Sequence, residues 1–170
     1  MTQIESANAL TMLSARTPRA VADTIAGVAV ATVELPAPPN DVFVALASDA
    51  IVRWWVRPGV FDTREWWGDV RPGGRWQASG LGRGQPYTLR GVYLEVNRSR
   101  ELVHTWEVSA VPGLVSTVTY LLAPSDEVEH GTRITLRHAG LNDTSVCIST
   151  AIGWETSFAA LATLLGSAPA

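Results

Sequence analysis

Six segments of strand length follow one another through the middle of this chain, separated by short stretches of turn-forming residues. The segments are rich in β-branched and aromatic residues, whereas the stretches between them are rich in Gly, Pro, Asn and Ser. The segments are residues 62–70, 74–79, 87–97, 101–109, 115–123 and 132–139. Because connections this short join antiparallel neighbours, the pattern predicts a six-stranded meander.

The flanking segments complete an α+β pattern. Residues 28–35, rich in Val, Ala and Thr, predict a first strand. Two short helices are expected after it, one opening at 38–41 and one around 51–55 that ends at Arg57-Pro58-Gly59. A long helix is expected from about 144 to 165, because apolar residues recur there at helical spacing. These residues are Trp154, Phe158, Leu161 and Leu165.

Together these elements predict the fold class and the domain organisation. We expect an α+β fold in which a curved antiparallel sheet of about seven strands wraps around the long C-terminal helix. A chain of 170 residues that is 46% apolar suits one domain, which we place at 28–166. Residues 1–27 are predicted to be an extension, partly helical or mobile. A short helix is expected there from Thr17-Pro18 to Gly27, with Gly27 in the left-handed conformation.

The charged residues exclude several classes of function. The chain has no lysine, which excludes Schiff-base chemistry and the lysine of a phosphate-binding loop. The net charge is −3 and the arginines are spread from Arg16 to Arg137 without a run, so nucleic-acid binding is not expected. No motif indicates a cofactor.

The location of the protein is predicted from the cysteine content and the apolar runs. The single cysteine, Cys147, cannot form an internal disulfide, and the N-terminus has no basic start before an apolar run, as a secretory signal would. The longest apolar run, residues 28–33, is far below the ~20 residues that a membrane-spanning helix needs. We therefore expect a cytoplasmic protein without a membrane span.

Tryptophan is concentrated in one stretch of the sequence. Five of the seven tryptophans lie within 54–76: they are Trp54, Trp55, Trp66, Trp67 and Trp76. This density favours either an oversized aromatic core or a lined cavity. Trp66 and Trp67 are adjacent in a predicted strand, so they must face opposite sides of the sheet, and only one of them can line a cavity.

Strand alternation predicts which side chains face the long helix. In each strand, the parity that carries the bulky apolar residues should point inward. The predicted inward residues are Trp76 and Ala78; Arg90, Val92, Leu94 and Val96; Leu102, His104, Trp106 and Val108; Val118, Tyr120 and Leu122; and Ile134, Leu136 and His138. Four of them are polar: Arg90, His104, Tyr120 and His138. A polar group there must find a partner or contact a ligand.

Two interpretations of these polar residues remain open. His104 and His138 are either core histidines satisfied by Tyr120, a carbonyl or water, or general acid/base groups. Arg90 either binds a carboxylate or phosphate of a ligand or points outward at the end of the sheet. A metal site is not expected, because the third histidine, His130, lies in a loop without ligand spacing.

Other catalytic patterns lack their parts. No inward carboxylate appears in the predicted strands, which excludes paired-acid chemistry of the glycosidase kind. No G-x-S-x-G elbow occurs for a serine nucleophile. The glycine-rich stretch 80–84 leads from one strand into another rather than into a helix, so it is interpreted as a hairpin and not as a phosphate cradle.

A series of motifs resembles a known superfamily. The motifs are Ala37-Pro38-Pro39-Asn40-Asp41-Val42-Phe43, Arg53-Trp54-Trp55, residues 69–76 (DVRPGGRW), residues 91–96 (GVYLEV), residues 101–106 (ELVHTW), residues 131–138 (GTRITLRH) and Gly153-Trp154. Over about 28–165 they resemble the START-related, birch-pollen-allergen-like (SRPBCC) superfamily, in its bacterial branch similar to the C-terminal domain of the heat-shock-protein ATPase activator. The resemblance implies a helix-grip fold with a ligand cavity between the long helix and the sheet. It does not imply one reaction, because the fold hosts binders, cyclases, hydrolases and co-chaperones.

Three functional hypotheses follow from the residues and the resemblance. The first is binding of a hydrophobic or aromatic small molecule, oriented by Arg90, His104 and His138. The predicted cavity residues are Trp54, Trp76, Trp106, Tyr120, Trp154 and Phe158. The second is an enzyme of the polyketide cyclase, dehydratase or hydrolase type, with His104 or His138 as general acid/base and Tyr120 as proton donor or oxyanion partner. The third is an interaction module that stimulates a chaperone ATPase. A homodimer is compatible with each, and residues 1–27 would cover either the mouth of the cavity or a dimer partner.

Overall fold

The computed structural model describes residues 17–166, which form one nine-stranded antiparallel sheet and the helices packed on it. The strands are β1 (Arg19–Asp23), β2 (Val28–Leu35), β3 (Val56–Arg57), β4 (Phe61–Gly68), β5 (Arg75–Gly82), β6 (Gln85–Asn97), β7 (Glu101–Val108), β8 (Val115–Pro124) and β9 (Thr132–Ala139). The helices are α2 (Pro39–Leu46), α3 (Ile51–Trp54) and α4 (Thr144–Gly166). The strand order is β1-β2-β9-β8-β7-β6-β5-β4-β3.

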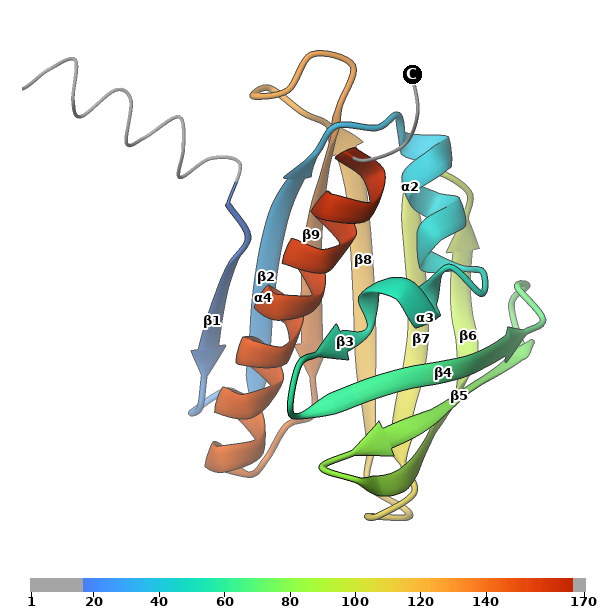
Figure 1. The fold of residues 1–170 in the computed structure, drawn as a ribbon, viewed down its shortest axis with the longest axis vertical. Helices are drawn as coiled ribbons and strands as arrows, with labels where there is room; N and C mark the ends of the chain where they lie inside the picture. Colours follow the sequence, from blue (N-terminus) through green and yellow to red (C-terminus); the bar gives the residue numbers. More distant parts are fainter. Residues whose placement is uncertain (1–16, 167–170) are drawn as a thin grey trace, which may run out of the picture.

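The sheet curls around α4, and α2 and α3 lie beside the C-terminal half of that helix (Figure 1). This arrangement confirms the predicted α+β, helix-grip class. The predicted meander is present as β4 to β9, each strand pairing with the next. The structure has nine strands rather than about seven, because β1 and β3 were not predicted.

The short helix predicted between Thr17 and Gly27 is wrong, because residues 19–23 form strand β1. Ala20 and Ala22 pack against a small core cluster that includes Ala29 of β2 and Cys147 of α4. This packing outweighs the four-residue spacing of Val21 and Ile25, which by itself favours a helix. Gly27 does have a positive φ, of 69°, as predicted, but it closes the β1–β2 hairpin instead of ending a helix. The rest of the predicted extension, residues 1–16, lies outside the described residues.

The predicted inward row of β6 is wrong over most of its length. Leu89 and Tyr93 are buried, whereas Arg90 is exposed and Leu94 is 47% exposed. The pairing with β7 shifts between Tyr93 and Glu95, and this bulge reverses the parity of the strand. Val96 therefore does pack against the core, as predicted. The prediction assumed strict alternation along the whole strand, and the bulge interrupts that alternation.

The other inward rows agree with the prediction. Leu102 and His104 of β7, Val118 and Tyr120 of β8 and Ile134, Leu136 and His138 of β9 are all buried. Trp66 pairs with the buried Ala78 and packs against the core, whereas Trp67 is 53% exposed. The adjacent tryptophans therefore face opposite sides, with Trp66 inside.

One face of the long C-terminal helix α4 is buried against the sheet. Its buried residues are Cys147, Ala151, Trp154, Ser157, Phe158 and Leu161, all of which face the sheet side of the helix. Among the described residues, α4 is the one helix that is long and apolar enough to cross a membrane. A core helix packed on a sheet passes the same test, and α4 is packed in that way.

Candidate functional site

A cavity of about 440 Å³ lies between the sheet and the N-terminal half of α4. One wall is the face of α4 that carries Ser149, Gly153 and Ser157. The opposite wall is formed by the β3–β4 turn and the β5–β6 hairpin, and Figure 1 shows the β3–β4 turn beside α4. The volume falls within the ~300–1,000 Å³ of ordinary small-molecule sites.

The deep part of the cavity is aromatic. Trp55, Trp106 and Trp154 line it, and their ring centroids lie 5.2 to 6.2 Å apart. Leu89 and Val108 add aliphatic surface from β6 and β7. The three indoles come from the residue that caps the end of α3, from β7 and from α4, so the wall exists only when all of these elements are packed together.

His138 is the polar group in this aromatic wall, and both of its ring nitrogens are engaged. The Nε1–H of Trp154 lies 3.0 Å from Nδ1 of His138, and Nε2 lies 2.7 Å from Oγ of Ser116. An indole can only donate, so Nδ1 is the acceptor and Nε2 carries the proton. Ser116 in turn donates to the carbonyl of Trp106, at 3.3 Å. The chain of three hydrogen bonds is complete with a neutral imidazole.

Burial keeps His138 in that neutral form. Desolvation, with a smaller contribution from the nearby His104, lowers the pKa of His138 from 6.5 to about 3. A proton on Nδ1 would also face the indole N–H of Trp154, donor against donor. At neutral pH His138 therefore holds the Trp154 indole in place and has no free lone pair for a general base.

Two further side chains form a polar pair in the wall. The hydroxyls of Thr63 on β4 and Tyr87 on β6 are hydrogen bonded to each other, and both residues line the cavity. Burial raises the pKa of Tyr87, and the nearby carboxylate of Asp62 adds to this effect while the hydrogen bond to Thr63 opposes it. Tyr87 is therefore a neutral phenol that can offer a hydrogen bond to a ligand.

Two arginines lie at the rim of the cavity. Arg57 ends β3 and is half-buried, and Arg83 lies in the β5–β6 turn and is exposed. The turns that carry them are tied together, because the backbone N–H of Arg83 donates to the carbonyl of Val60 at 2.8 Å. The mouth of the cavity is therefore positively charged, while its depth is apolar.

The other predicted polar residues lie behind the aromatic wall and do not line the cavity. His104 is 3% exposed, and its Nδ1 donates to the carbonyl of Thr105 at 2.9 Å. Desolvation lowers the pKa of His104 from 6.5 to about 4. Tyr120 is fully buried, and burial raises its pKa well above 10, with Tyr93 adding to this effect and Trp55 opposing it. The Trp55 indole N–H is near the Tyr120 hydroxyl, but the hydroxyl makes no hydrogen bond of normal geometry among the described residues.

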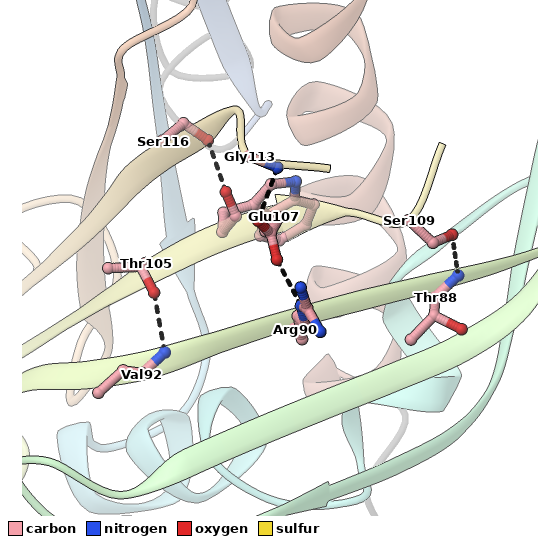
Figure 2. Close-up of polar contacts among 9 residues, drawn as sticks. Thr88, Arg90, Val92, Thr105, Glu107, Ser109, Gly113 and Ser116 are labelled. Atoms are coloured by element: carbon pink, nitrogen blue, oxygen red, sulfur yellow. Dashed lines mark hydrogen bonds and ion pairs between the residues drawn. The ribbon is translucent and has the colours of Figure 1, made fainter. Parts of the chain in front are cut away.

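The predicted inward orientation of Arg90 is wrong. Its side chain is 66% exposed on the outer face of the sheet, where it forms an ion pair with Glu107. Figure 2 shows this pair, together with the backbone N–H of Gly113 that donates to the same carboxylate at 2.9 Å. The hydrogen bonds and the neighbouring charge of Arg90 lower the pKa of Glu107. These groups link β6, β7 and the following loop, away from the cavity.

The predicted aromatic residues divide between the cavity and the closed core. Trp106 and Trp154 line the cavity. Trp54, Trp76 and Phe158 are buried but do not line it. Trp54 donates its indole N–H to the carbonyl of Ala45 at 2.9 Å, and Trp76 lies edge-on to His104 with centroids 4.9 Å apart.

Several lining residues were not predicted as site residues. Trp55 was placed in the helix pair without being assigned to the cavity, and Tyr87 lies on the parity of β6 that the prediction turned outward. Arg57 and Arg83 lie in stretches that were interpreted only as turns. The positive charge in two turns was a signal in the sequence, but nothing in the sequence brings the two turns together.

The described residues contain no cluster of three or more His, Cys, Asp or Glu side chains that could hold a metal ion. The third histidine, His130, lies in the β8–β9 loop with its side chain 91% exposed, next to Glu129. The arrangement is therefore suited to binding a ligand, with aromatic surface in the depth of the cavity, a phenol in one wall and arginines at the mouth.

Comparisons with solved structures show the same fold. A protein of Rhodobacter sphaeroides is 18% identical, with a TM-score of 0.73, over 89% of this chain and 99% of that chain. A protein of Chromobacterium violaceum is 24% identical, with a TM-score of 0.71, over 81% of this chain and 96% of that chain. CalU16 from Micromonospora echinospora is 22% identical, with a TM-score of 0.59, over 89% of this chain and 85% of that chain.

A search of curated proteins found no significant match. The family model of the Activator of Hsp90 ATPase homolog 1-like proteins, by contrast, matches residues 36–166, which is most of the chain. This match confirms the superfamily resemblance inferred from the motifs. The fold is one that typically serves ligand binding or polyketide cyclase-like chemistry. The chain belongs to the family of Activator of Hsp90 ATPase homolog 1-like proteins.

Proposed function

We propose that this protein binds a hydrophobic small molecule with an aromatic body in the cavity between α4 and the sheet. One observation supports the proposal above the others: a cavity of about 440 Å³ whose depth is lined by Trp55, Trp106 and Trp154. Indole faces and edges bind aromatic rings by offset or edge-to-face stacking. Leu89 and Val108 supply the aliphatic surface that removes the rest of such a ligand from water.

The side chains on α4 support the same proposal. Besides Trp154, α4 presents Ser149, Thr150, Gly153 and Ser157 at the cavity, and these four are small. A Cβ built at Gly153 would contact only the ring of Phe61, at 3.7 Å. A larger residue there would project into the cavity, so the small residues keep it open.

The enzymatic alternative receives less support from the geometry. His138 lines the cavity, but its lone pair accepts the Trp154 N–H and its pKa is lowered to about 3 by burial. His104 and Tyr120 do not line the cavity. Acid/base catalysis by these residues would require the aromatic wall to move. We therefore place binding first. The chaperone-activating alternative rests on the family name and on no feature of the described residues.

The proposal is tested by titrating the protein with N-phenylnaphthylamine, an uncharged aromatic probe whose fluorescence rises in apolar surroundings. We expect saturable binding to the wild type. Gly153→Leu should abolish binding or weaken it at least about tenfold by filling the cavity, an effect equivalent to ~1.4 kcal/mol. Gly153→Ala is the matched control, because it makes the same kind of helix-favouring change and adds only a methyl group.

Both variants are checked by thermal unfolding, because replacing a helical glycine should hold or raise stability. The absence of probe binding to the wild type would overturn the proposal. Equal binding by wild type and Gly153→Leu would show that the probe binds elsewhere and would also overturn it. Native mass spectrometry of protein purified from its own host then identifies a co-purifying ligand by its mass.

A further inference from the structure

We propose that the ligand of this cavity carries an anionic group, such as a carboxylate, sulfonate or phosphate, that Arg57 and Arg83 bind at the mouth. The inference rests on the proposed function and adds the charge of the ligand to it. The two arginines come from different hairpins, and the structure brings both to the rim of the same cavity.

The backbone holds the two arginine-bearing turns together. The β3–β4 turn is closed by a hydrogen bond from the N–H of Val60 to the carbonyl of Arg57, at 2.9 Å. The carbonyl of Val60 then accepts the N–H of Arg83, at 2.8 Å. Val60 therefore links the two turns directly, so the two arginines belong to one connected rim rather than to two independent loops.

The backbone of Arg83 is in a conformation that arginine seldom adopts. Its φ is 49°, and the following Gly84 has a φ of 79°, the pattern of a tight two-residue hairpin turn. Asn, Asp and Gly are the usual residues at such a position. Retaining arginine there has a conformational cost, and a role for its charge accounts for that cost.

The charge balance of the rim also favours an anion. Some exposed arginines face nearby carboxylates: Arg64 lies 3.0 Å from Asp62, and Arg71 lies 2.7 Å from Asp69. Neither Arg57 nor Arg83 forms an ion pair within the part of the chain that the structure describes.

No acidic side chain occurs among the described residues that line the cavity. Asp62 is adjacent in sequence to the buried Thr63, but alternation along β4 turns it to the opposite face, where Arg64 binds it. The positive charge at the mouth is therefore not neutralised by the protein itself.

The combination predicts an amphiphilic ligand with a defined orientation. Its aromatic body packs against Trp55, Trp106 and Trp154, and its anionic group remains at the solvent-facing mouth. Guanidinium groups bind carboxylates and phosphates through paired hydrogen bonds, so two of them at one rim favour a planar or tetrahedral oxyanion. An uncharged ligand of the same body would bind more weakly.

The test compares two probes that share one aromatic body. N-phenylnaphthylamine is uncharged, and anilinonaphthalene sulfonate adds a single sulfonate to it. For the wild type we expect the sulfonate to bind more tightly and its affinity to fall with added salt, as an ion pair near a surface requires. The Arg57→Gln, Arg83→Asn double variant should lose about tenfold or more in affinity for the sulfonate, the effect of one or two charge-assisted bonds.

The same double variant should bind the uncharged probe within about twofold of the wild type, because its aromatic wall is unchanged. Asn at position 83 suits the left-handed backbone, so the hairpin is preserved. A charge-retaining variant, Arg57→Lys with Arg83→Lys, should keep most of the preference for the sulfonate. The matched control is Arg75→Gln with Arg137→Gln, which removes the same charge from exposed positions outside the cavity lining and should change neither affinity.

The outcomes separate this inference from the proposed function. If the wild type binds neither probe, the proposed function itself fails. If the wild type binds the uncharged probe and the double variant binds both probes as the wild type does, the cavity binds ligands but the arginines do not select an anion. An equal loss of sulfonate affinity in the control pair would show that net charge, and not the rim, is responsible.

Discussion

The two halves of α4 pack against the sheet in different ways. In the C-terminal half, Phe158 and Leu161 are completely buried, and the Phe158 ring lies 6.2 Å from that of Trp54. In the N-terminal half, Gly153 and its small neighbours face the cavity, while Cys147 and Ala151 pack tightly on the other side against β1 and β2. Trp154 lies between the two regions, in contact with both Phe158 and Trp106.

The difference shows that side-chain volume along one helix decides where the domain is closed and where it is open. Both halves are apolar, and both face the same curved sheet. Large side chains fill the space at one end, whereas small ones leave it for a ligand at the other. The closed end is therefore expected to carry most of the stability and the open end most of the binding.

The largest expected effect is at the closed end. Phe158→Ala removes a completely buried ring from the contact with Trp54 and should lower the free energy of unfolding by about 3–5 kcal/mol. Urea unfolding followed by tryptophan fluorescence measures this loss. Phe158→Leu, which keeps most of the volume, is the control and should cost less than about 1.5 kcal/mol. A loss below about 1 kcal/mol for the alanine variant would contradict the view that this end is tightly closed.

Two buried histidines, His138 and His104, should make the free energy of unfolding depend on pH. Burial lowers the pKa of His138 to about 3 and that of His104 to about 4, whereas both are near 6.5 in the unfolded chain. Below that value the unfolded chain binds protons that the folded protein does not, so the free energy of unfolding decreases as the pH is lowered. The two residues together should lose about 2 kcal/mol of stability between about pH 6.5 and about pH 5.5.

Urea unfolding across this pH range measures the slope. His138→Gln should roughly halve it by removing one of the two titrating groups. His130→Gln removes a histidine that is 91% exposed and should leave the slope unchanged. A free energy of unfolding that is flat from about pH 7 to about pH 5.5 would mean that the two histidines are not buried as described.

The smallest expected effect compares two adjacent tryptophans. Trp54 belongs to the closed end and donates its indole N–H to the Ala45 carbonyl at 2.9 Å, whereas the N–H of Trp55 is near the Tyr120 hydroxyl but makes no hydrogen bond of normal geometry among the described residues. Trp54→Phe and Trp55→Phe remove the same atoms, so Trp54→Phe should cost about 1 kcal/mol more in unfolding free energy.

Binding of N-phenylnaphthylamine should rank the two variants in the reverse order. Trp55 lines the cavity and Trp54 does not, so only Trp55→Phe should weaken the probe affinity. If Trp54→Phe weakened binding more than Trp55→Phe, the division of α4 into a closed and an open end would be wrong.

Much of the fold was predictable from local sequence patterns. Strands β2 and β9 begin and end where the apolar runs and their Gly and Pro neighbours predicted, and α4 follows the spacing of Trp154, Phe158 and Leu161. The inward rows of β7, β8 and β9 follow strict alternation, because no bulge interrupts those strands. Local propensity and side-chain period are sufficient for such elements.

The failures occur where a distant contact overrides the local pattern. Strand β1 forms because Ala20 and Ala22 pack on small residues of the neighbouring β2 and of α4, and α4 lies more than 120 residues away in sequence. A bulge after Tyr93 reverses the alternation of β6. Arg90, which precedes the bulge, therefore faces outward although Val96, at the same parity beyond it, faces the core. The adjacent tryptophans Trp54 and Trp55 look equivalent in sequence, yet one lies in the closed core and the other in the cavity wall.

The sequence by itself determined the class of the fold, the long helix and the aromatic character of the interior, because these depend on period, turn chemistry and composition. Only the tertiary structure decided which indoles line a cavity, which histidine holds one of them and which arginines meet at the mouth. Those relations join residues from separate hairpins and from α4 across long sequence separations. They arise only when the sheet has curled around the helix and small side chains have left one part of the interface unfilled.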